Sequence, residues 1–374
     1  MFNFNLIYKF YYEWWKNIDK TLFILIILLF SLGLFFSLAS TSLIASDKLD
    51  TNNYFFFFKH LIFISIGMII LIFFSSLSEK NLFKFSNYLF FVSLFLLFLV
   101  PILGAEVKGS RRWLNLFFLP RFQPIELVKP FIIIFIATIL CSEKNFNIYF
   151  KYLLTFVAII PICLLLIMQP DIGQTLLVFL SWSILIFISG VSLPIILTVI
   201  SFSLLSLVYM VFFISKFDYI KSRIQSFFNP IDGTYTFQPN QAIDAISSGG
   251  FFGKGIGEGT LKNKVPEAHT DYIVSVISEE FGVVVIILLL FLFLFFIYLV
   301  LKKIYLERNE KIKLVLTGTV SLIIFQALIH FGVNIRLLPT TGMTLPFLSY
   351  GGSSIVGVSI LSGIILNLTK RKID

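Results

Sequence analysis

Long runs of apolar residues dominate the chain, and polar residues are confined to the intervals between these runs. A helix needs about 20 consecutive apolar residues to cross roughly 30 Å of bilayer hydrocarbon. Runs of this kind predict ten transmembrane helices, at residues 21–43, 54–76, 83–103, 124–141, 152–168, 171–190, 192–214, 272–301, 312–336 and 345–368. The predicted fold class is an all-α polytopic membrane protein that forms one integral membrane domain over residues 1–374.

Composition supports this prediction. Hydrophobic residues make up 58% of the chain and charged residues 13%, and the mean hydropathy is +0.95. These values exclude a water-soluble domain of this length. Cys141 and Cys163 both fall in predicted helices without the spacing of a disulfide or a metal site, and the three histidines lie far apart, so neither a disulfide nor a histidine-based metal site is expected. The basic clusters at 302–303 and 370–372 are typical of cytoplasmic anchors, and no nucleic-acid partner is expected.

The only long polar interval is residues 215–271, between the seventh and eighth predicted helices. With the N-terminus in the cytoplasm, ten spans place both termini inside and this interval outside. Its six basic residues are matched by six acidic ones. When it is set aside, Lys and Arg are more frequent on the inside, as expected for cytoplasmic loops. The first apolar run is too long for the core of a cleaved signal peptide, so it is expected to be a retained anchor.

Asp271 ends this polar interval, and an apolar run begins at Tyr272. Asp271 is therefore expected at a membrane boundary, on the first turn of a spanning helix. One interpretation is that it only caps the helix, beside Thr270. The other is that it takes part in the chemistry of the protein, which is expected where the long polar interval meets water.

A second polar segment contains Arg111, Arg112 and Trp113, and the fourth predicted helix then begins with Glu126 and Lys129 on one face. These residues allow two interpretations. The first is an intrahelical ion pair beside arginines that extend to the membrane surface. The second is a cationic, aromatic-lined pocket for an anionic group at the outer leaflet, because ionisable residues within a membrane are usually functional.

Further polar positions lie at membrane depth. Asp171 is either the cap of the sixth helix or part of a line of polar groups facing an internal cavity. Glu279 and Glu280 lie about two turns into the eighth helix and are expected to face other helices or a wet cavity. The glycine-rich residues 249–259 do not match a phosphate-binding loop, and a tightly turned loop with closely approaching backbone is expected. Residues 338–354 combine prolines, glycines and hydroxyls, so they must be packed inside the protein or line a cavity.

Together these motifs resemble the SEDS family (shape, elongation, division and sporulation) of bacterial peptidoglycan polymerases. The resemblance covers essentially the whole chain. The motifs that carry it are residues 108–113, 123–129, 169–175, 248–259, 266–271, 279–282 and 338–354. Residues 266–271 and 338–354 look more like the division members than the elongation members. Ile125 stands where the family usually has a small Ser, a departure that removes no ionisable group.

The resemblance implies a glycosyltransferase that polymerises lipid II, the undecaprenyl-pyrophosphate-linked disaccharide pentapeptide, with inversion at the anomeric carbon. It implies action at the outer face of the bacterial cytoplasmic membrane, with a class B penicillin-binding transpeptidase and other division proteins as partners. Asp271 is the implied catalytic carboxylate and general base, and its position agrees with this role, because a helix N-terminus favours an ionised carboxylate. The residues expected to bind substrate are Arg111, Arg112, Trp113, Glu126, Lys129, His269, Glu280, Ser349 and Ser353.

Two other functions stay open from the sequence. A ten-span protein with prolines in the membrane could be a lipid II flippase, although the inverted halves common in transporters are not visible. A non-catalytic scaffold of the division machinery is the other. A divalent ion, Mg²⁺ or Mn²⁺, at the pyrophosphate would suit the chemistry, but the sequence contains no dedicated set of ligands for it.

Overall fold

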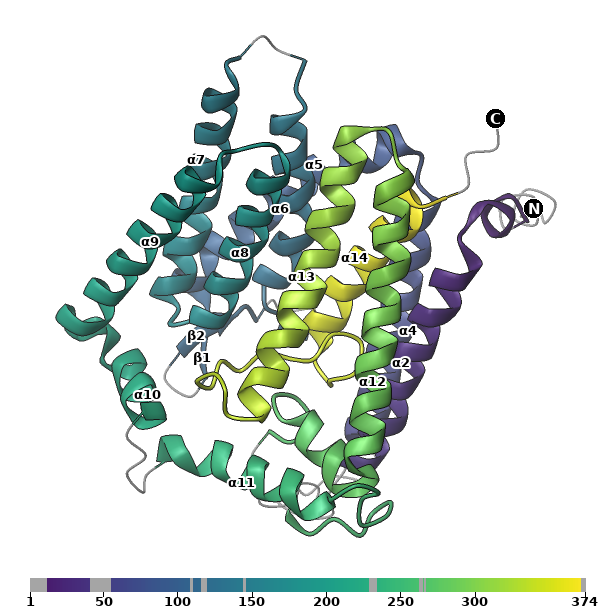
Figure 1. Ribbon diagram of the computed structural model, residues 1–374, viewed down its shortest axis with the longest axis vertical. Helices are drawn as coiled ribbons and strands as arrows, with labels where there is room; N and C mark the ends of the chain where they lie inside the picture. The colour runs from purple at the N-terminus through teal and green to yellow at the C-terminus, as the bar shows by residue number, and fades with distance from the viewer. Residues whose placement is uncertain are drawn as a thin grey trace.

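The computed structural model describes residues 12–40, 55–107, 110–115, 120–143, 146–228, 234–261, 265 and 267–370. Each predicted apolar run contains one long helix, and these helices run up and down in a bundle (Figure 1). They are α2 (Lys20–Ser40), α4 (Phe55–Ser76), α5 (Glu79–Leu103), α6 (Ile125–Leu140), α7 (Ile148–Met168), α8 (Ile172–Ile188), α9 (Leu193–Phe213), α12 (Ile273–Leu306), α13 (Glu310–Asn334) and α14 (Gly352–Leu368).

Seven of these helices are long and apolar enough to cross a membrane: α2, α4, α5, α7, α9, α12 and α13. The protein is therefore a multi-pass membrane protein. Helices α6, α8 and α14 have 16, 17 and 17 residues, so the count of ten spans stays a prediction. The start of the last span was predicted wrongly, because α14 begins at Gly352 and residues 345–351 are irregular. Pro346 has no backbone N–H for a helix, and Phe347 adopts φ 67°.

The centre of the bundle is formed by α6, α8, α13 and α14, whose residues are largely buried. Helix α13 is largely buried, whereas α9 is mostly exposed at the edge of the bundle. Helix α14 packs closely along α4, where Gly67 faces Ser359 and Gly363 faces Leu71. Small residues of this kind permit close helix contacts where there is no hydrophobic drive between helices in lipid.

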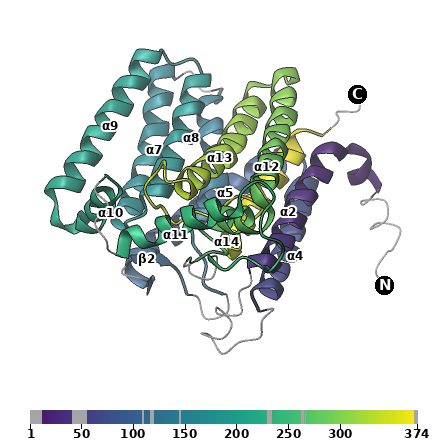
Figure 2. The same ribbon diagram turned by 60° about the horizontal axis from the view of Figure 1, so that its bottom comes forward.

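One end of the bundle carries the non-spanning elements. These are a hairpin of β1 (Ala105–Val107) and β2 (Ser110–Trp113), the 3-10 turn η1 (Ser215–Phe217), and helices α10 (Asp218–Phe228) and α11 (Thr234–Gly249). Figure 2, in which this end comes forward, shows α10, α11 and β2 across the end of the bundle. Helix α2 begins and α14 ends at the opposite end (Figure 1). Neither α10 nor the hairpin was predicted from the sequence.

Helix α12 is interrupted at Gly282, where φ is 79° and ψ is 177°. The glycine-rich loop after α11 pairs with the backbone exposed by this break. Lys254 N donates to Glu279 O at 2.9 Å, and Val283 N donates to Gly250 O at 3.0 Å. The expected tight loop with closely approaching backbone is confirmed, because a side chain at Gly249 or Gly253 would collide with the backbone of α12.

Candidate functional site

Asp271 lies in a turn that immediately precedes α12. The N–H groups of Thr270 and Asp271 both donate to the carbonyl of Glu267, each at 3.0 Å. The first residue of α12 is Ile273, so Asp271 lies two residues before the helix. The prediction from the sequence, which placed Asp271 on the first turn of the helix, was wrong in this respect. It still lies at the helix N-terminus, where the backbone dipole favours a negative charge.

Three consecutive carbonyl groups of this turn, at residues 269–271, are held by the segment 334–350. They accept, in order, from Tyr350 N at 3.0 Å, Ser349 Oγ at 2.7 Å and Asn334 Nδ2 at 3.1 Å. The backbone that carries Asp271 is therefore tied to the end of α13 and to the irregular segment before α14.

The ring of His269 belongs to an aromatic cluster at the same turn. Its centroid is 4.6 Å from that of Phe56 on α4 and 5.6 Å from that of Tyr350. The cluster links α4 to the turn that carries Asp271. A contact of His269 with substrate stays a prediction.

Arg111 and Arg112 are neighbours on β2, and successive side chains of a strand point to opposite faces. Arg111 forms an exposed ion pair with Glu106 of β1 at 3.3 Å. Arg112 points to the turn between α7 and α8. Its Nε donates to the carbonyl of Gln169 at 3.2 Å, and its Nη2 donates to the carbonyl of Pro170. Of these two arginines, only Arg112 therefore reaches the interior of this end of the bundle.

Asp271 and Arg112 converge on Gly342. A Cβ atom at Gly342 would lie 3.5 Å from Oδ2 of Asp271 and 4.0 Å from Nη1 of Arg112. The carboxylate and the guanidinium, which come from segments far apart in the chain, thus face the same point.

Asp171 connects Arg112 to the buried interior. Its Oδ2 is 3.6 Å from Nη1 of Arg112 and accepts from Nε2 of Gln123 at 3.1 Å. Its Oδ1 accepts from the N–H of Gln174 at 3.3 Å, which caps α8. The hydroxyl of Ser353 accepts from Gln123 N at 2.9 Å. Asp171 is therefore a helix cap and also part of a line of polar groups, and an internal cavity beside this line stays a prediction.

Glu126 and Lys129 form the predicted intrahelical ion pair. Lys129 Nζ is 2.8 Å from Glu126 Oε2, and their side chains are only 2% and 3% exposed. The ammonium also donates to Oε1 of Gln326 at 3.1 Å, and Gln174 donates to Glu126 Oε1 at 2.9 Å. The pair joins α6, α8 and α13. A contact of either residue with substrate stays a prediction.

Several polar side chains that were not predicted as site residues extend this network. Gln326 donates to Oγ1 of Thr344 at 3.3 Å, and Thr344 donates to Ser354 at 2.7 Å. Gln123 and Gln174 complete the connection to Asp171. The signal that could have found them is an amide or a hydroxyl next to or within an apolar run, because an isolated polar group is costly there.

Glu280 and Trp113 lie apart from this convergence. Glu280 is buried, and its Oε1 accepts from Gly257 N at 3.2 Å. Glu279 accepts from Leu261 N at 2.9 Å. Both carboxylates thus hold the glycine-rich loop. Trp113 is half-buried on β2. Substrate contacts of Glu280 and Trp113 stay predictions.

Within the described ranges, no group of three or more His, Cys, Asp or Glu side chains could hold a metal ion. The binding of a divalent ion, Mg²⁺ or Mn²⁺, at the pyrophosphate stays a prediction.

The fold and the site define a polytopic membrane protein in which a carboxylate and a guanidinium both approach Gly342 at one end of the bundle. A family model described as "Cell cycle protein", which covers FtsW, RodA and SpoVE, matches residues 19–373. The chain belongs to this family.

Relatives and solved structures agree with this assignment. The chain is 34% identical over 280 residues to the "Probable peptidoglycan glycosyltransferase FtsW" of Caulobacter vibrioides, covering 73% of this chain and 69% of the relative. It is 35% identical over 279 residues to the protein of the same name from Nitrosomonas europaea, covering 72% and 70%.

Two solved structures show the same fold. One, described as "Structural coordination of polymerization and crosslinking by a peptidoglycan synthase complex", matches with a TM-score of 0.76 at 26% identity, covering 94% of this chain and 97% of that one. The other is the rod shape determining protein RodA of Thermus thermophilus, with a TM-score of 0.69 at 25% identity, covering 94% and 96%.

Proposed function

We propose that this protein is a peptidoglycan glycosyltransferase that polymerises lipid II at the outer face of the bacterial cytoplasmic membrane during cell division. Relatives more than 30% identical carry the name peptidoglycan glycosyltransferase FtsW. The observation that carries the proposal at the residue level is the convergence of Asp271 and Arg112 on Gly342. If the end of the bundle that carries Asp271 faces outward, as this function requires, both termini are cytoplasmic.

Asp271 is the general base of the proposed reaction. A sugar hydroxyl of one lipid-linked glycan attacks the anomeric carbon of the other, and the proton of that hydroxyl passes to the Asp271 carboxylate as the new C–O bond forms. The bond from the anomeric carbon to the pyrophosphate breaks, and its electron pair leaves with the lipid pyrophosphate. Attack opposite to the leaving group inverts the configuration at this carbon.

Arg112 stabilises the negative charge that develops on the departing pyrophosphate. Its guanidinium is oriented before the reaction by the carbonyls of Gln169 and Pro170 and by Asp171. A cation held in place in this way stabilises a transition state without a cost for reorganisation. The three hydrogen bonds to the carbonyls of residues 269–271 likewise hold the backbone of the base in place before the reaction.

A class B penicillin-binding transpeptidase is the proposed partner, which would crosslink the strands made here. This part of the proposal is supported by the similarity to a structure described as a peptidoglycan synthase complex that couples polymerization and crosslinking. Other division proteins are further proposed partners.

The test is polymerisation of lipid II by the purified protein with its transpeptidase in detergent. We expect glycan strands from the wild-type protein and none from Asp271→Asn. The matched control is Glu258→Gln, an exposed carboxylate of the same polar interval, which should polymerise at the wild-type rate. No polymer from the wild-type protein would favour a flippase. Polymer at the wild-type rate from Asp271→Asn would remove Asp271 from the mechanism. A non-catalytic scaffold predicts this same result, because Asp271 would then be dispensable in the assay.

A further inference from the structure

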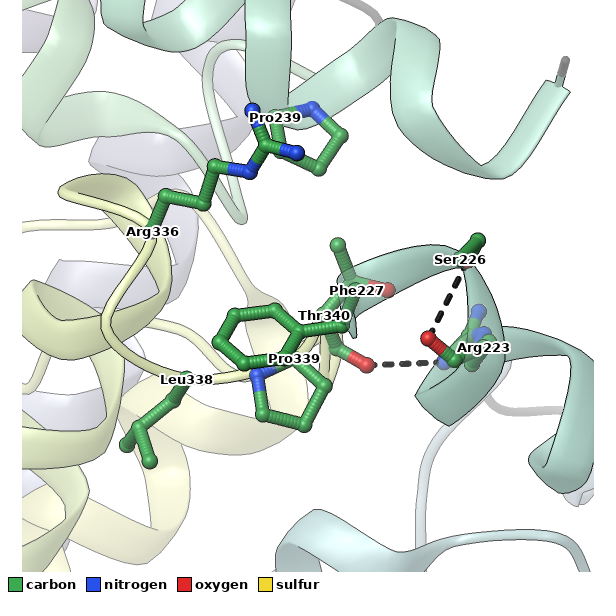
Figure 3. Close-up of a pocket in the computed structure, with 8 residues that line it drawn as sticks. All are labelled: Arg223, Ser226, Phe227, Pro239, Arg336, Leu338, Pro339 and Thr340. Carbon is green, nitrogen blue, oxygen red and sulfur yellow. Dashed lines mark hydrogen bonds between the residues drawn. The ribbon is translucent and has the colours of Figure 1, made fainter. Parts of the chain in front are cut away.

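A cleft opens at the outer end of the bundle between α10, α11 and the segment that follows α13. Its lining includes Arg223 and Phe227 of α10, Arg336, Pro339 and Thr340. Figure 3 shows Pro239 of α11 on one side of the cleft, together with Arg336, which follows α13. Arg223 and Ser226 of α10 lie on another side, and Pro339 and Thr340 lie between the two sides.

Hydrogen bonds to fixed groups orient both guanidiniums. Arg223 Nη1 donates to the carbonyl of Thr340 at 3.1 Å, and Arg336 Nη1 donates to Oδ1 of Asn240 at 2.9 Å. The backbone of Arg336 adopts φ 56°. Residues other than glycine seldom adopt this conformation, and such strain concentrates at functional sites.

The lining has the chemistry of a site for an oxyanion. Two guanidiniums contribute to it, and no acidic side chain is among the lining residues that the structure describes. A guanidinium presents a planar fork of N–H donors that matches phosphate oxygens, and bonds from it to phosphate are charge-assisted.

The cleft adjoins the site of Asp271. Thr340 lines it, and two residues further along the chain Gly342 faces the Asp271 carboxylate.

Exposed apolar side chains adjoin the cationic lining. Phe228 is 73% exposed, Ile335 49% and Leu337 69%, and each is next in sequence to a lining residue. Exposed apolar surface beside oriented cations suits a ligand with an anionic head and an apolar chain.

We propose that this cleft binds the pyrophosphate headgroup of a polyprenyl-linked glycan through Arg223 and Arg336. The proposal rests on the function proposed above and deepens it, because polymerisation brings two lipid-linked pyrophosphates to one base. Arg112 meets the pyrophosphate that leaves, and the Arg223–Arg336 cleft holds the one that stays attached to the attacking sugar.

Binding is measured first without turnover, in the full-length Asp271→Asn protein in detergent. The probes are undecaprenyl pyrophosphate, inorganic pyrophosphate and undecaprenol. We expect that adding Arg336→Gln or Arg223→Gln weakens binding of undecaprenyl pyrophosphate about tenfold, the effect of about one charge-assisted hydrogen bond. Undecaprenol binding should not change. The matched control is Arg308→Gln, an exposed arginine at the opposite end of the bundle.

Kinetics in the active protein provide the second arm. Arg336→Gln should raise KM for lipid II about tenfold and change kcat less than about threefold, because a group that binds ground and transition states equally acts on KM. Arg336→Lys, which keeps the charge, should recover part of the affinity. Asn240→Ala separates binding by the charge of Arg336 from a structural role of Arg336. It removes the hydrogen bond that orients Arg336 but leaves the charge, so KM should rise less than in Arg336→Gln.

Equal affinities of the glutamine variants and Arg308→Gln for undecaprenyl pyrophosphate would overturn the cleft proposal. An effect of equal size in Asn240→Ala and Arg336→Gln would do so too, because the residue would then only support the fold. Weakened binding of inorganic pyrophosphate alone would identify the free anion as the ligand and also overturn it. A wild-type protein without polymerase activity would instead contradict the proposed function, so the two failures are distinguishable.

Discussion

The hydroxyl of Ser349 donates a hydrogen bond of 2.7 Å to the carbonyl of Thr270, the residue immediately before Asp271. The same hydroxyl accepts from the N–H of Leu345 at 2.8 Å. One side chain thus joins the irregular segment before α14 to the turn that carries the proposed base. The position of Asp271 therefore depends on a residue far away in the sequence.

Ser349→Ala should lower kcat for lipid II polymerisation about tenfold with little change in KM, because the backbone that orients Asp271 loses an anchor. The two groups left unpaired should also lower the free energy of unfolding by about 1–3 kcal/mol each. Initial rates and thermal melts measure these effects. Ser349→Thr keeps the hydroxyl and should recover much of the rate, and Ser76→Ala, at the other end of the bundle, is the control. A wild-type kcat in Ser349→Ala would contradict the positioning role.

Arg112→Lys should reduce polymerisation at least about tenfold. An ammonium is a point charge, and it cannot reproduce the planar fork with which Arg112 binds the carbonyls of Gln169 and Pro170. Measured rates of strand formation test this prediction. Arg121→Gln changes an exposed arginine of the same outer segment and should have no effect. Equal losses in both variants would contradict a role specific to the guanidinium of Arg112.

Lys129→Met should destabilise the protein by about 3–5 kcal/mol, because it leaves the buried carboxylate of Glu126 without its cation. The double variant Glu126→Leu with Lys129→Met should recover most of that stability, since it removes both charges. Thermal melts of the purified variants give the comparison. Activity of the folded double variant then decides whether Lys129 also contacts substrate: full activity excludes that contact, and loss of activity supports it.

Gly282→Ala should destabilise the protein by about 3 kcal/mol or more, because φ 79° with ψ 177° is a backbone conformation nearly restricted to glycine. A Cβ at this position would also overlap the carbonyl of Phe251. Gly190→Ala is the matched control, as Gly190 has φ 99° with no atom within 4 Å of the added Cβ. Equal losses in the two variants would show that the packing of the glycine-rich loop adds nothing.

The sequence determined the helices of this protein and the chemical types available at its site. An apolar run long enough to cross a bilayer must satisfy its own backbone hydrogen bonds, so each run predicts a helix from local information alone. Residues 338–344 were also predicted to be irregular, since proline and glycine do not favour a helix, but the start of the last helix was placed too early, at residue 345. The polar groups at Asp271, Arg112 and the Glu126–Lys129 pair were visible as exceptions to the apolar pattern.

Only the tertiary structure decided which of these groups meet. Arg112 reaches the α7–α8 turn and not solvent because β2 alternates its side chains, and the pairing of β1 with β2 is not encoded in either short strand. Asp271 faces Arg112 across Gly342 because α13 and the segment before α14 hold the turn at residues 269–271. Contacts between segments so far apart in the chain depend on how whole helices pack, and packing is decided by the shapes of many side chains together, which no local pattern contains.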